Sequence, residues 1–447
     1  MKKLVVAAFL LSTGPVFGQH WSELHTQATV PPREALDRLN LQVAWSTNVP
    51  TEGKKDGLFS VQVFDDVILA QTRSGLLTAV RLDDGSIQWS VPVGVPYRVT
   101  HPVGRNAESV FVYNGTHLIS LARSNAALQW VFNLSAAPSA APVAEKDRIY
   151  ISLTGGKFFV FGLPELPKTP VGFKGTTARR TTAAAPPSPT DFLAGSMGFS
   201  EPPITGDQWS NRGPQPELLW EYRSDTPLEQ APLLSEEVIL LAGYDGTFFC
   251  TSKDLRQVLY KLKAHAPLAA PLGQYNDTAY VASTEYDVYA LQMLVGKVTW
   301  HYVSGTPILR KPEVNDEDVF IAPKRPNLAR VNRETGEKIW TNQKADRFIA
   351  ANKKFVYAAD PNGRLLILDK KYGTILSTFD TRDFVVPVSN ELTDRIYLAA
   401  NNGLLVCLHD KEYPKPRPMK KNPDAPKPKP GAKPAEPPKP KGEEREK

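Results

Sequence analysis

The sequence predicts an all-β protein: an eight-bladed β-propeller of four-stranded antiparallel blades, closed by an N-terminal strand that completes the last blade. Three observations lead to this prediction: a repeated strand–turn–strand unit with an aromatic end, a fixed spacing between copies, and one unassigned strand near the N-terminus. Clear copies are GLLTAVRLDDGSIQW, ending at Trp89, and PNLARVNRETGEKIW, ending at Trp340. The spacing is 40 residues from Tyr260 to Trp300 and 40 again to Trp340. A strand repeat with a period near 40 residues is typical of propeller blades.

Each predicted blade contains a run rich in Val, Ile, Tyr and Phe, the composition of half-buried strands. Eight such runs follow one another, at 67–72, 110–115, 149–154, 238–243, 279–284, 319–324, 355–360 and 396–401. Seven aromatic ends follow them, at Trp89, Trp130, Trp220, Tyr260, Trp300, Trp340 and Phe379. The eighth run has no outer strand after it, whereas LQVAWS (41–46) has no blade. We expect this N-terminal segment to complete the eighth blade, because a closed ring also removes an exposed sheet edge.

The aromatic ends are predicted to be structural. A large flat side chain on the outermost strand is suited to wedge between neighbouring blades, and its burial contributes about 2–3 kcal/mol. The tryptophans assigned to this role are Trp45, Trp89, Trp130, Trp220, Trp300 and Trp340. Glycines in the preceding turns, such as Gly336, are expected to supply positive φ.

A central channel is the expected ligand site of such a ring. Short segments that end in proline, such as LRKP (309–312), are interpreted as the inner strands that line it. Counting two and four residues back from these prolines gives the candidate binding residues Arg98, Thr100, Gln230, Arg310 and Asp383. An inward arginine is suited to bind a carboxylate or sugar acid, or to form an ion pair between blades, for example with Glu229 or Asp383. Both interpretations stay open.

Residues 1–18 are predicted to be a secretory signal peptide, with Lys2 and Lys3 before the apolar run 4–11. We therefore expect a protein exported across the inner membrane that is periplasmic or associated with the outer envelope. No apolar run is long enough to predict a transmembrane segment. Prolines followed by good helix formers predict one short helix within 19–40, outside the propeller of residues 41–410.

Two segments of biased composition add to the propeller. Residues 164–216 lengthen one repeat and are predicted to be a low-complexity loop inserted in blade three. Residues 411–447 are predicted to be a disordered Pro/Lys-rich tail, with eleven prolines from Tyr413 onward. Contact with an anionic envelope surface and a role as a soluble spacer both stay open for this tail. The tail and signal peptide carry the basic excess behind the formal charge of +6, so the remainder is nearly neutral and no nucleic-acid partner is expected.

Neither a metal motif nor a catalytic motif is found, so no catalytic, cofactor-binding or metal-ligating residues are assigned. The two cysteines, Cys250 and Cys407, each follow a repeat glycine by four residues. Equivalent positions in non-adjacent blades are too far apart for a disulfide. A sugar-cleaving propeller would need paired carboxylates facing the channel, and none is found.

The repeat, in copies such as LLTAVRLDDGSIQW and DVYALQMLVGKVTW, resembles the pyrroloquinoline-quinone (PQQ) type of propeller repeat over residues 41–410. One branch of this family resembles the BamB-type component of the outer-membrane protein assembly machinery. That resemblance implies a non-enzymatic interaction scaffold, here a monomer that binds envelope proteins and holds no cofactor. Known members of that branch are lipid-anchored, and this chain lacks the anchoring cysteine. The alternative branch, the quinone-dependent dehydrogenases, implies an oxidoreductase with PQQ and calcium in the channel. Those enzymes carry a vicinal disulfide, whereas this chain has no adjacent cysteines.

Overall fold

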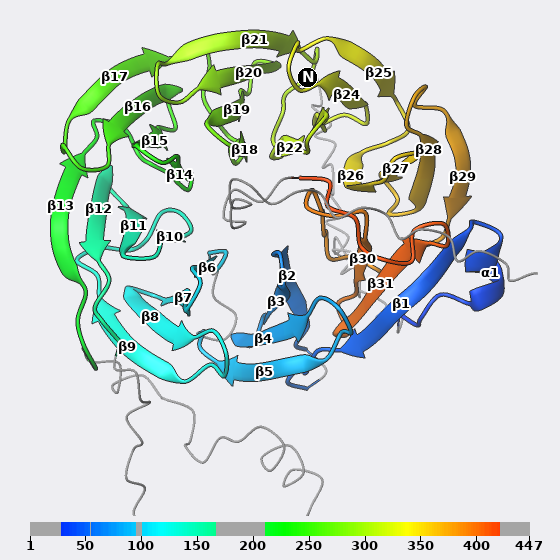
Figure 1. The fold of residues 1–447 in the computed structure, drawn as a ribbon, viewed down its shortest axis with the longest axis horizontal. Coiled ribbons are helices and arrows are strands. Elements are labelled where there is room, and N and C mark those ends of the chain that lie inside the picture. The colour runs from blue at the N-terminus through cyan, green and yellow to red at the C-terminus, as the bar shows by residue number, and fades with distance from the viewer. Residues whose placement is uncertain (1–27, 54, 95–100, 167–210, 421–447) are drawn as a thin grey trace, which may run out of the picture.

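The computed structural model describes residues 28–53, 55–94, 101–166 and 211–420, which form a closed ring of eight β-sheets (Figure 1). Blades one to four are β2 (Leu58–Val63), β3 (Val67–Thr72), β4 (Leu76–Arg81), β5 (Ile87–Pro92); β6 (Gly104–Arg105), β7 (Ser109–Asn114), β8 (His117–Ala122), β9 (Leu128–Asn133); β10 (Val143–Ala144), β11 (Arg148–Leu153), β12 (Lys157–Gly162), β13 (Glu217–Arg223); and β14 (Leu233–Leu234), β15 (Val238–Ala242), β16 (Thr247–Ser252), β17 (Val258–Lys263).

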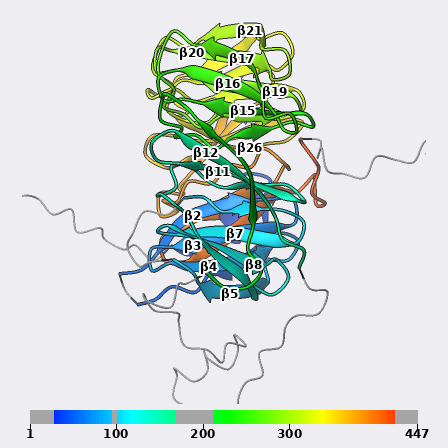
Figure 2. The ribbon, with the colours of Figure 1, turned by 90° about the vertical axis from the view of Figure 1, so that its left-hand side faces the viewer.

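Blades five to eight complete the ring, and the side view shows the sheets stacked around it (Figure 2). Their strands are β18 (Gly273–Tyr275), β19 (Thr278–Ala282), β20 (Asp287–Gln292), β21 (Lys297–Val303); β22 (Glu313–Val314), β23 (Asp318–Ile321), β24 (Leu328–Asn332), β25 (Lys338–Asn342); β26 (Arg347–Ala351), β27 (Phe355–Ala359), β28 (Leu365–Asp369), β29 (Ile375–Phe379); and β30 (Ile396–Ala399), β31 (Leu404–Asp410) with β1 (Leu41–Asn48). The predicted fold class is confirmed, and each predicted Val/Ile-rich run forms the second strand of its blade.

The N-terminal strand closes the ring, as the leftover segment predicted. Strand β1 pairs antiparallel with β31, from Leu41 opposite Asp410 to Asn48 opposite Leu404. Figure 1 shows β1 and β31 side by side in this sheet. The inner edge of blade eight is reduced to a single bridge between Val386 and Ala399. Blade eight is therefore built from segments at opposite ends of the sequence.

The predicted inner strands are displaced from the observed ones. In blades two to six the proline-ending segments are linkers, and the inner strand begins one or two residues after the proline, for example at Glu313 after Pro312. In blade eight, Val386 of the segment 384–387 forms the single inner bridge itself. Proline lacks the N–H that a strand contributes to its ladder, so the ladder starts beyond it. Residues counted back from the prolines, including Gln230 and Arg310, therefore lie before the inner strands and not on them.

The aromatic ends join neighbouring blades. The Nε1 of Trp45 donates to the carbonyl of Leu82 in blade one at 2.8 Å. The same 2.8 Å bond links Trp89 to Arg123, Trp300 to Arg333 and Trp340 to Lys370. All six predicted tryptophans, Trp45, Trp89, Trp130, Trp220, Trp300 and Trp340, are buried. Each outer strand also carries a bulge beside this residue, as between Ala79 and Val80 opposite Trp89, which re-aims the local side chains.

The indole rings pack against turn glycines of the next blade. Glycine is favoured there both by the positive φ and by the lack of space for a Cβ atom, and one comparison separates these two reasons. We expect Gly336→Ala to destabilise the protein more than Gly305→Ala, although φ is +75° and +77° respectively. Both substitutions incur about 1–2 kcal/mol for the left-handed backbone. A Cβ on Gly336 would also lie 2.6 Å from Cγ of Trp300, whereas one on Gly305 meets nothing within 4 Å. Chemical denaturation should show an extra loss of about 1–3 kcal/mol for Gly336→Ala; equal losses would contradict this packing role.

The flanking segments are partly described. Helix α1 (Arg33–Asp37) lies outside the ring against β1, as expected for the 19–40 segment (Figure 1). The predicted signal peptide and most of the 164–216 insertion lie outside the described residues. Where the insertion returns, Arg212 bridges Val131 on the outer strand of blade two. Residues 411–420 were predicted to be part of a disordered tail, but they are hydrogen-bonded to the ring, for example Met419 N to Leu392 O at 2.7 Å.

Candidate functional site

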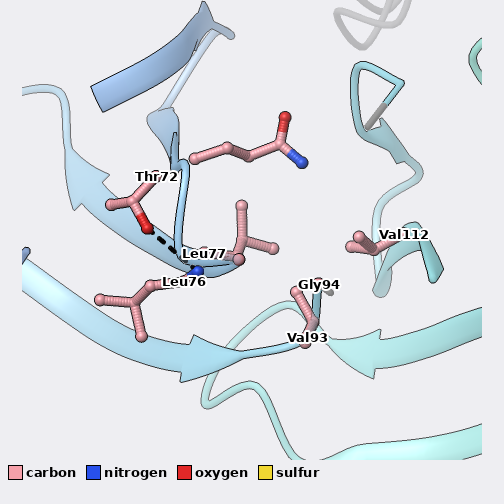
Figure 3. Close-up of a pocket in the computed structure, with 8 residues that line it drawn as sticks. Thr72, Leu76, Leu77, Val93, Gly94 and Val112 are labelled. Carbon is pink, nitrogen blue, oxygen red and sulfur yellow. Dashed lines mark hydrogen bonds between the residues drawn. The ribbon is translucent and has the colours of Figure 1, made fainter. Parts of the chain in front are cut away.

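A small cavity between blades one and two is a packing gap. It lies where Thr72 accepts a hydrogen bond from the amide of Leu76 at 3.1 Å, with Val112 of blade two opposite (Figure 3). Its volume is about 10 Å³, the space of one water molecule at most. This cavity is too small to bind a substrate.

A larger cavity lies among the inner segments of blades six, seven and eight, and we call it the channel cavity. Its volume is about 100 Å³, roughly ten times that of the first cavity. The charged residues that line it are Arg310, Lys311, Glu313 and Arg347. Its apolar wall includes Phe320 and Phe348, whose ring centroids stack 4.3 Å apart. Such a mixture of apolar walls and convergent polar groups is characteristic of ligand sites.

The five residues predicted to face the channel are not brought together there. Arg310 lines the channel cavity, whereas Gln230 is half-buried and Asp383 is exposed, and neither lines it. Arg98 and Thr100 lie outside the described residues. The displacement of the inner strands beyond the prolines accounts for the positions of Gln230 and Asp383.

Arg310 is held in an ion pair between blades. Its Nη2 lies 2.8 Å from Oδ2 of Asp346, and its Nη1 donates to the carbonyl of the same residue. Asp346 directly precedes the inner strand of blade seven, and Arg310 lies in the segment that leads into blade six. The ion pair therefore connects blade six to blade seven. The sequence left open an ion pair with Glu229 or Asp383, and the observed partner is Asp346.

Buried ion pairs connect the channel cavity to the C-terminal segment. The Nζ of Lys311 lies 3.2 Å from Glu313 and 3.3 Å from Glu391, and the Nζ of Lys420 lies 2.5 Å from Glu391. Ser389 also donates to Glu313 at 2.6 Å. Burial raises the pKa of Glu313. Burial acts in the same direction on Glu391, but the charges of Lys311 and Lys420 outweigh it and lower the pKa of Glu391 to about 2.

Arg347 is the cation of this group whose Nε lacks a partner. It begins strand β26, lines the channel cavity, and its Nε is buried without a hydrogen-bond partner. Burial, together with the nearby charge of Arg310, lowers the pKa of Arg347. Counting back from prolines missed this residue, because the segment ADRFIAA (345–351) contains no proline.

A second feature lies on the outer rim, and we call it the rim patch. It consists of exposed apolar side chains from the last turns and outer strands of blades four and five: Leu255, Val258, Leu259, Leu294, Val295 and Val298. The two blades meet within the patch, because Tyr260 donates to the carbonyl of Met293 at 2.5 Å and its ring faces Gly296. Strands β17 and β21 follow one another on the outside of the ring (Figure 1).

The repeat provides an internal comparison for the rim patch. The last turn of most blades carries a positive-φ residue, and the two residues before it differ between blades. They are Asp83-Asp84 in blade one, Ser124-Asn125 in blade two and Glu334-Thr335 in blade six, but Leu294-Val295 in blade five. The turn geometry therefore does not require apolar residues in blade five. The exposed apolar side chains there are available for contact with another molecule.

A family model described as outer membrane protein assembly factor BamB matches residues 34–163 and 214–376, more than half of the 447 residues. The chain belongs to this family. The resemblance to PQQ-type repeat propellers related to BamB is thereby confirmed. The match omits the blade-three insertion and ends within β29. The rim patch, Lys311 and Arg347 fall inside the matched BamB ranges, whereas Glu391 and Lys420 fall outside them.

Solved structures share the fold. The crystal structure of BamB from Moraxella catarrhalis has a TM-score of 0.58 and 16% sequence identity, covering 83% of this chain and 98% of that one. A computationally designed protein, Ika8, has a TM-score of 0.54 and 12% identity, covering 82% and 99%. At these identities the likeness shows the fold alone. No curated protein matches this chain in sequence.

Among the described residues, no group of three or more His, Cys, Asp and Glu side chains that could hold a metal ion occurs. In the same residues, no helix has the length and apolar character needed to cross a membrane.

Proposed function

We propose that this protein is an exported, non-catalytic propeller that acts as a protein–protein interaction scaffold in the cell envelope. Membership of the BamB family supports this proposal. The observation that carries it is the rim patch, where the last turns of blades four and five expose Leu255, Leu294 and Val295. Blades one, two and six have polar residues before the positive-φ residue of the same turn. We infer that the protein is a monomer that holds no cofactor and binds an envelope protein through this patch.

The chemistry of the rim patch favours a protein partner. Its most exposed members, Leu255 and Val295, are 72% and 63% exposed. Basic and acidic residues flank them, with Asp254 and Arg256 on either side of Leu255 and Lys297 after Gly296. An apolar centre with a polar surround is the usual anatomy of a protein interface. Leu and Val side chains cannot form the hydrogen bonds or ion pairs by which nucleic acids and sugars are recognised.

Site-specific crosslinking in cells tests this proposal. A photo-crosslinking amino acid at Val295 should capture one envelope protein, whereas the same amino acid at Asp84, the equivalent turn position of blade one, should not. Adding Leu294→Glu, which places a charge in the apolar centre, should abolish the crosslink without unfolding an exposed turn. Identical crosslinks from Val295 and Asp84, or recovery of the protein from the cytoplasm, would contradict the proposal.

The alternative function, a quinone-dependent oxidoreductase, makes a different prediction. If PQQ and calcium bind in the channel, adding both to the purified protein should produce a quinone absorbance band and turnover of an alcohol or sugar. Such turnover would overturn the non-catalytic proposal, whatever the crosslinking shows. Contact of the basic tail with an anionic envelope surface stays a separate prediction, which binding to anionic vesicles would test.

A further inference from the structure

We propose that the channel cavity is a binding site for a single carboxylate group that carries a short apolar substituent, with Arg347 as its principal ligand. This inference does not depend on the proposed scaffold function. It rests on the charge balance of the cavity, on an unsatisfied buried donor, and on the cavity's size and walls.

The charge balance leaves one cation over. The ion pairs around the cavity involve three carboxylates, Asp346, Glu313 and Glu391. Arg310 neutralises Asp346, while Lys311 and Lys420 neutralise the two glutamates. Arg347 remains, and within the described part of the chain it has no ion pair of its own. A buried cation is costly unless it is paired, so a monoanion beside Arg347 would complete the group.

The donor geometry points to the same ligand. The Nε of Arg347 is buried without a hydrogen-bond partner, and its side chain lines the cavity. Buried polar groups are nearly always hydrogen-bonded, so an orphaned one calls for a partner. The guanidinium fork matches a carboxylate bidentately. A neutral ligand could accept the hydrogen bond from the Nε of Arg347, but it would not neutralise the charge of the guanidinium group.

The walls and volume limit what else the ligand contains. The stacked rings of Phe320 and Phe348, with Ala322 and Val388, form an apolar wall. A volume of about 100 Å³ admits a carboxylate with a few carbon atoms but excludes a multi-ring molecule. The ligand is therefore either a free short-chain carboxylate or an acidic side chain presented by a peptide.

The C-terminal segment sets the charge of this site. Lys420 neutralises Glu391. Without Lys420, the negative charge of Glu391 would be offset by Lys311 alone, and the electrostatic potential in the cavity would be less positive. The segment is fixed by backbone bonds, including Asp316 N to Met419 O at 2.8 Å. Removing the Lys420 charge should weaken anion binding without altering the cavity lining.

Calorimetric titration of the full-length mature protein tests the proposal, with butyrate as the carboxylate and butyramide as its neutral counterpart. Butyrate should bind and butyramide should not. Arg347→Gln should weaken butyrate binding at least tenfold, and Lys420→Gln should weaken it several-fold. Arg382→Gln, which removes an exposed arginine paired with Asp380, is the matched charge control and should leave the affinity unchanged.

A short peptide with one glutamate distinguishes the two sources of the carboxylate. A glutamate peptide that binds no more tightly than butyrate assigns the site to free carboxylates. A glutamate peptide that binds more tightly than both butyrate and the matching glutamine peptide assigns it to an acidic side chain. If Arg347→Gln does not fold, Arg347→Lys keeps the charge and should bind more weakly than the unmodified protein. Absence of butyrate binding, or binding that neither Arg347 variant changes, overturns the proposal.

Discussion

Deleting the chain up to Asn48 will leave a protein that no longer folds as a monomeric ring. Strand β1 contributes the outer strand of blade eight, and all seven residues of its partner β31 are buried. Without β1, the Leu404–Asp410 strand becomes an exposed apolar edge, which templates pairing with other chains. Size-exclusion chromatography with light scattering should show oligomers or aggregates, and the thermal unfolding transition should broaden or vanish.

Two further experiments distinguish the loss of strand β1 from the loss of the Trp45 side chain alone. Trp45→Ala, which keeps the strand but removes the 7%-exposed indole, should cost about 3–5 kcal/mol and leave a monomer. A synthetic peptide of residues 28–48 added in trans should restore the monomeric ring to the truncated chain, and the same peptide with Trp45→Ala should restore it less well. A truncated protein that stays monomeric with an unchanged melting temperature would contradict closure by β1.

Lys311→Met is expected to be the most destabilising single substitution among the channel residues. Lys311 lies between Glu313 and Glu391, whose side chains are 13% and 14% exposed. Replacing it leaves Glu391 paired with Lys420 and removes the ion pair of Glu313, which has no other cationic partner among the described residues. Breaking a buried pair in this way typically costs about 3–5 kcal/mol. Denaturant unfolding near pH 7 should show a loss of this size.

Between pH 5 and 8 the stability of the variant should depend more steeply on pH than that of the unmodified protein. With Lys311 present, the pKa of Glu391 is lowered to about 2 from the 4.5 of an unperturbed glutamate. That carboxylate therefore stabilises the fold above about pH 4.5, and the contribution is lost as the pH falls towards 2. Glu313 acts oppositely, because its raised pKa gives a contribution that is present at low pH and lost as the pH rises.

In Lys311→Met, Glu313 loses the charge that most opposes the effect of its burial, so its pKa should rise further, whereas Glu391 keeps its ion pair with Lys420. The variant should then gain stability relative to the unmodified protein as the pH falls from 8 to 5. The double variant Lys311→Met with Glu313→Leu removes one charge of each sign and should recover most of the loss at pH 7. A destabilisation that is independent of pH, or a double variant no better than the single one, would rule out this account.

The sequence predicted the ring because its repeating features are set by local packing rules. The aromatic end and turn glycine recur since every blade must contact the next one in the same way. The inner strands were misplaced because proline was interpreted as their end, whereas it precedes their start. Arg347 was missed for the same reason, since its blade has no such proline.

The two candidate sites depend on information that a repeat pattern does not contain. The rim patch departs from the repeat at Leu294-Val295, and a comparison of turn residues between blades could have found it. The pairing of Lys311 with Glu391 and Lys420 joins residues from blade six, blade eight and the C-terminal segment, whose proximity depends on closure of the whole ring. Composition also assigned residues 411–420 to the tail, because proline and lysine content does not reveal a docked segment.

Closure by the first strand also constrains the order of events during synthesis. Asn40 hydrogen-bonds to Asp410 across 370 residues of sequence, so the earliest strand to be made is among the last to find its place. Contacts this distant slow folding. Until residues 404–410 have been translated, β1 has no neighbour to pair with. A ribosome that stalls before that point leaves a nascent chain with its opening strand still unpaired.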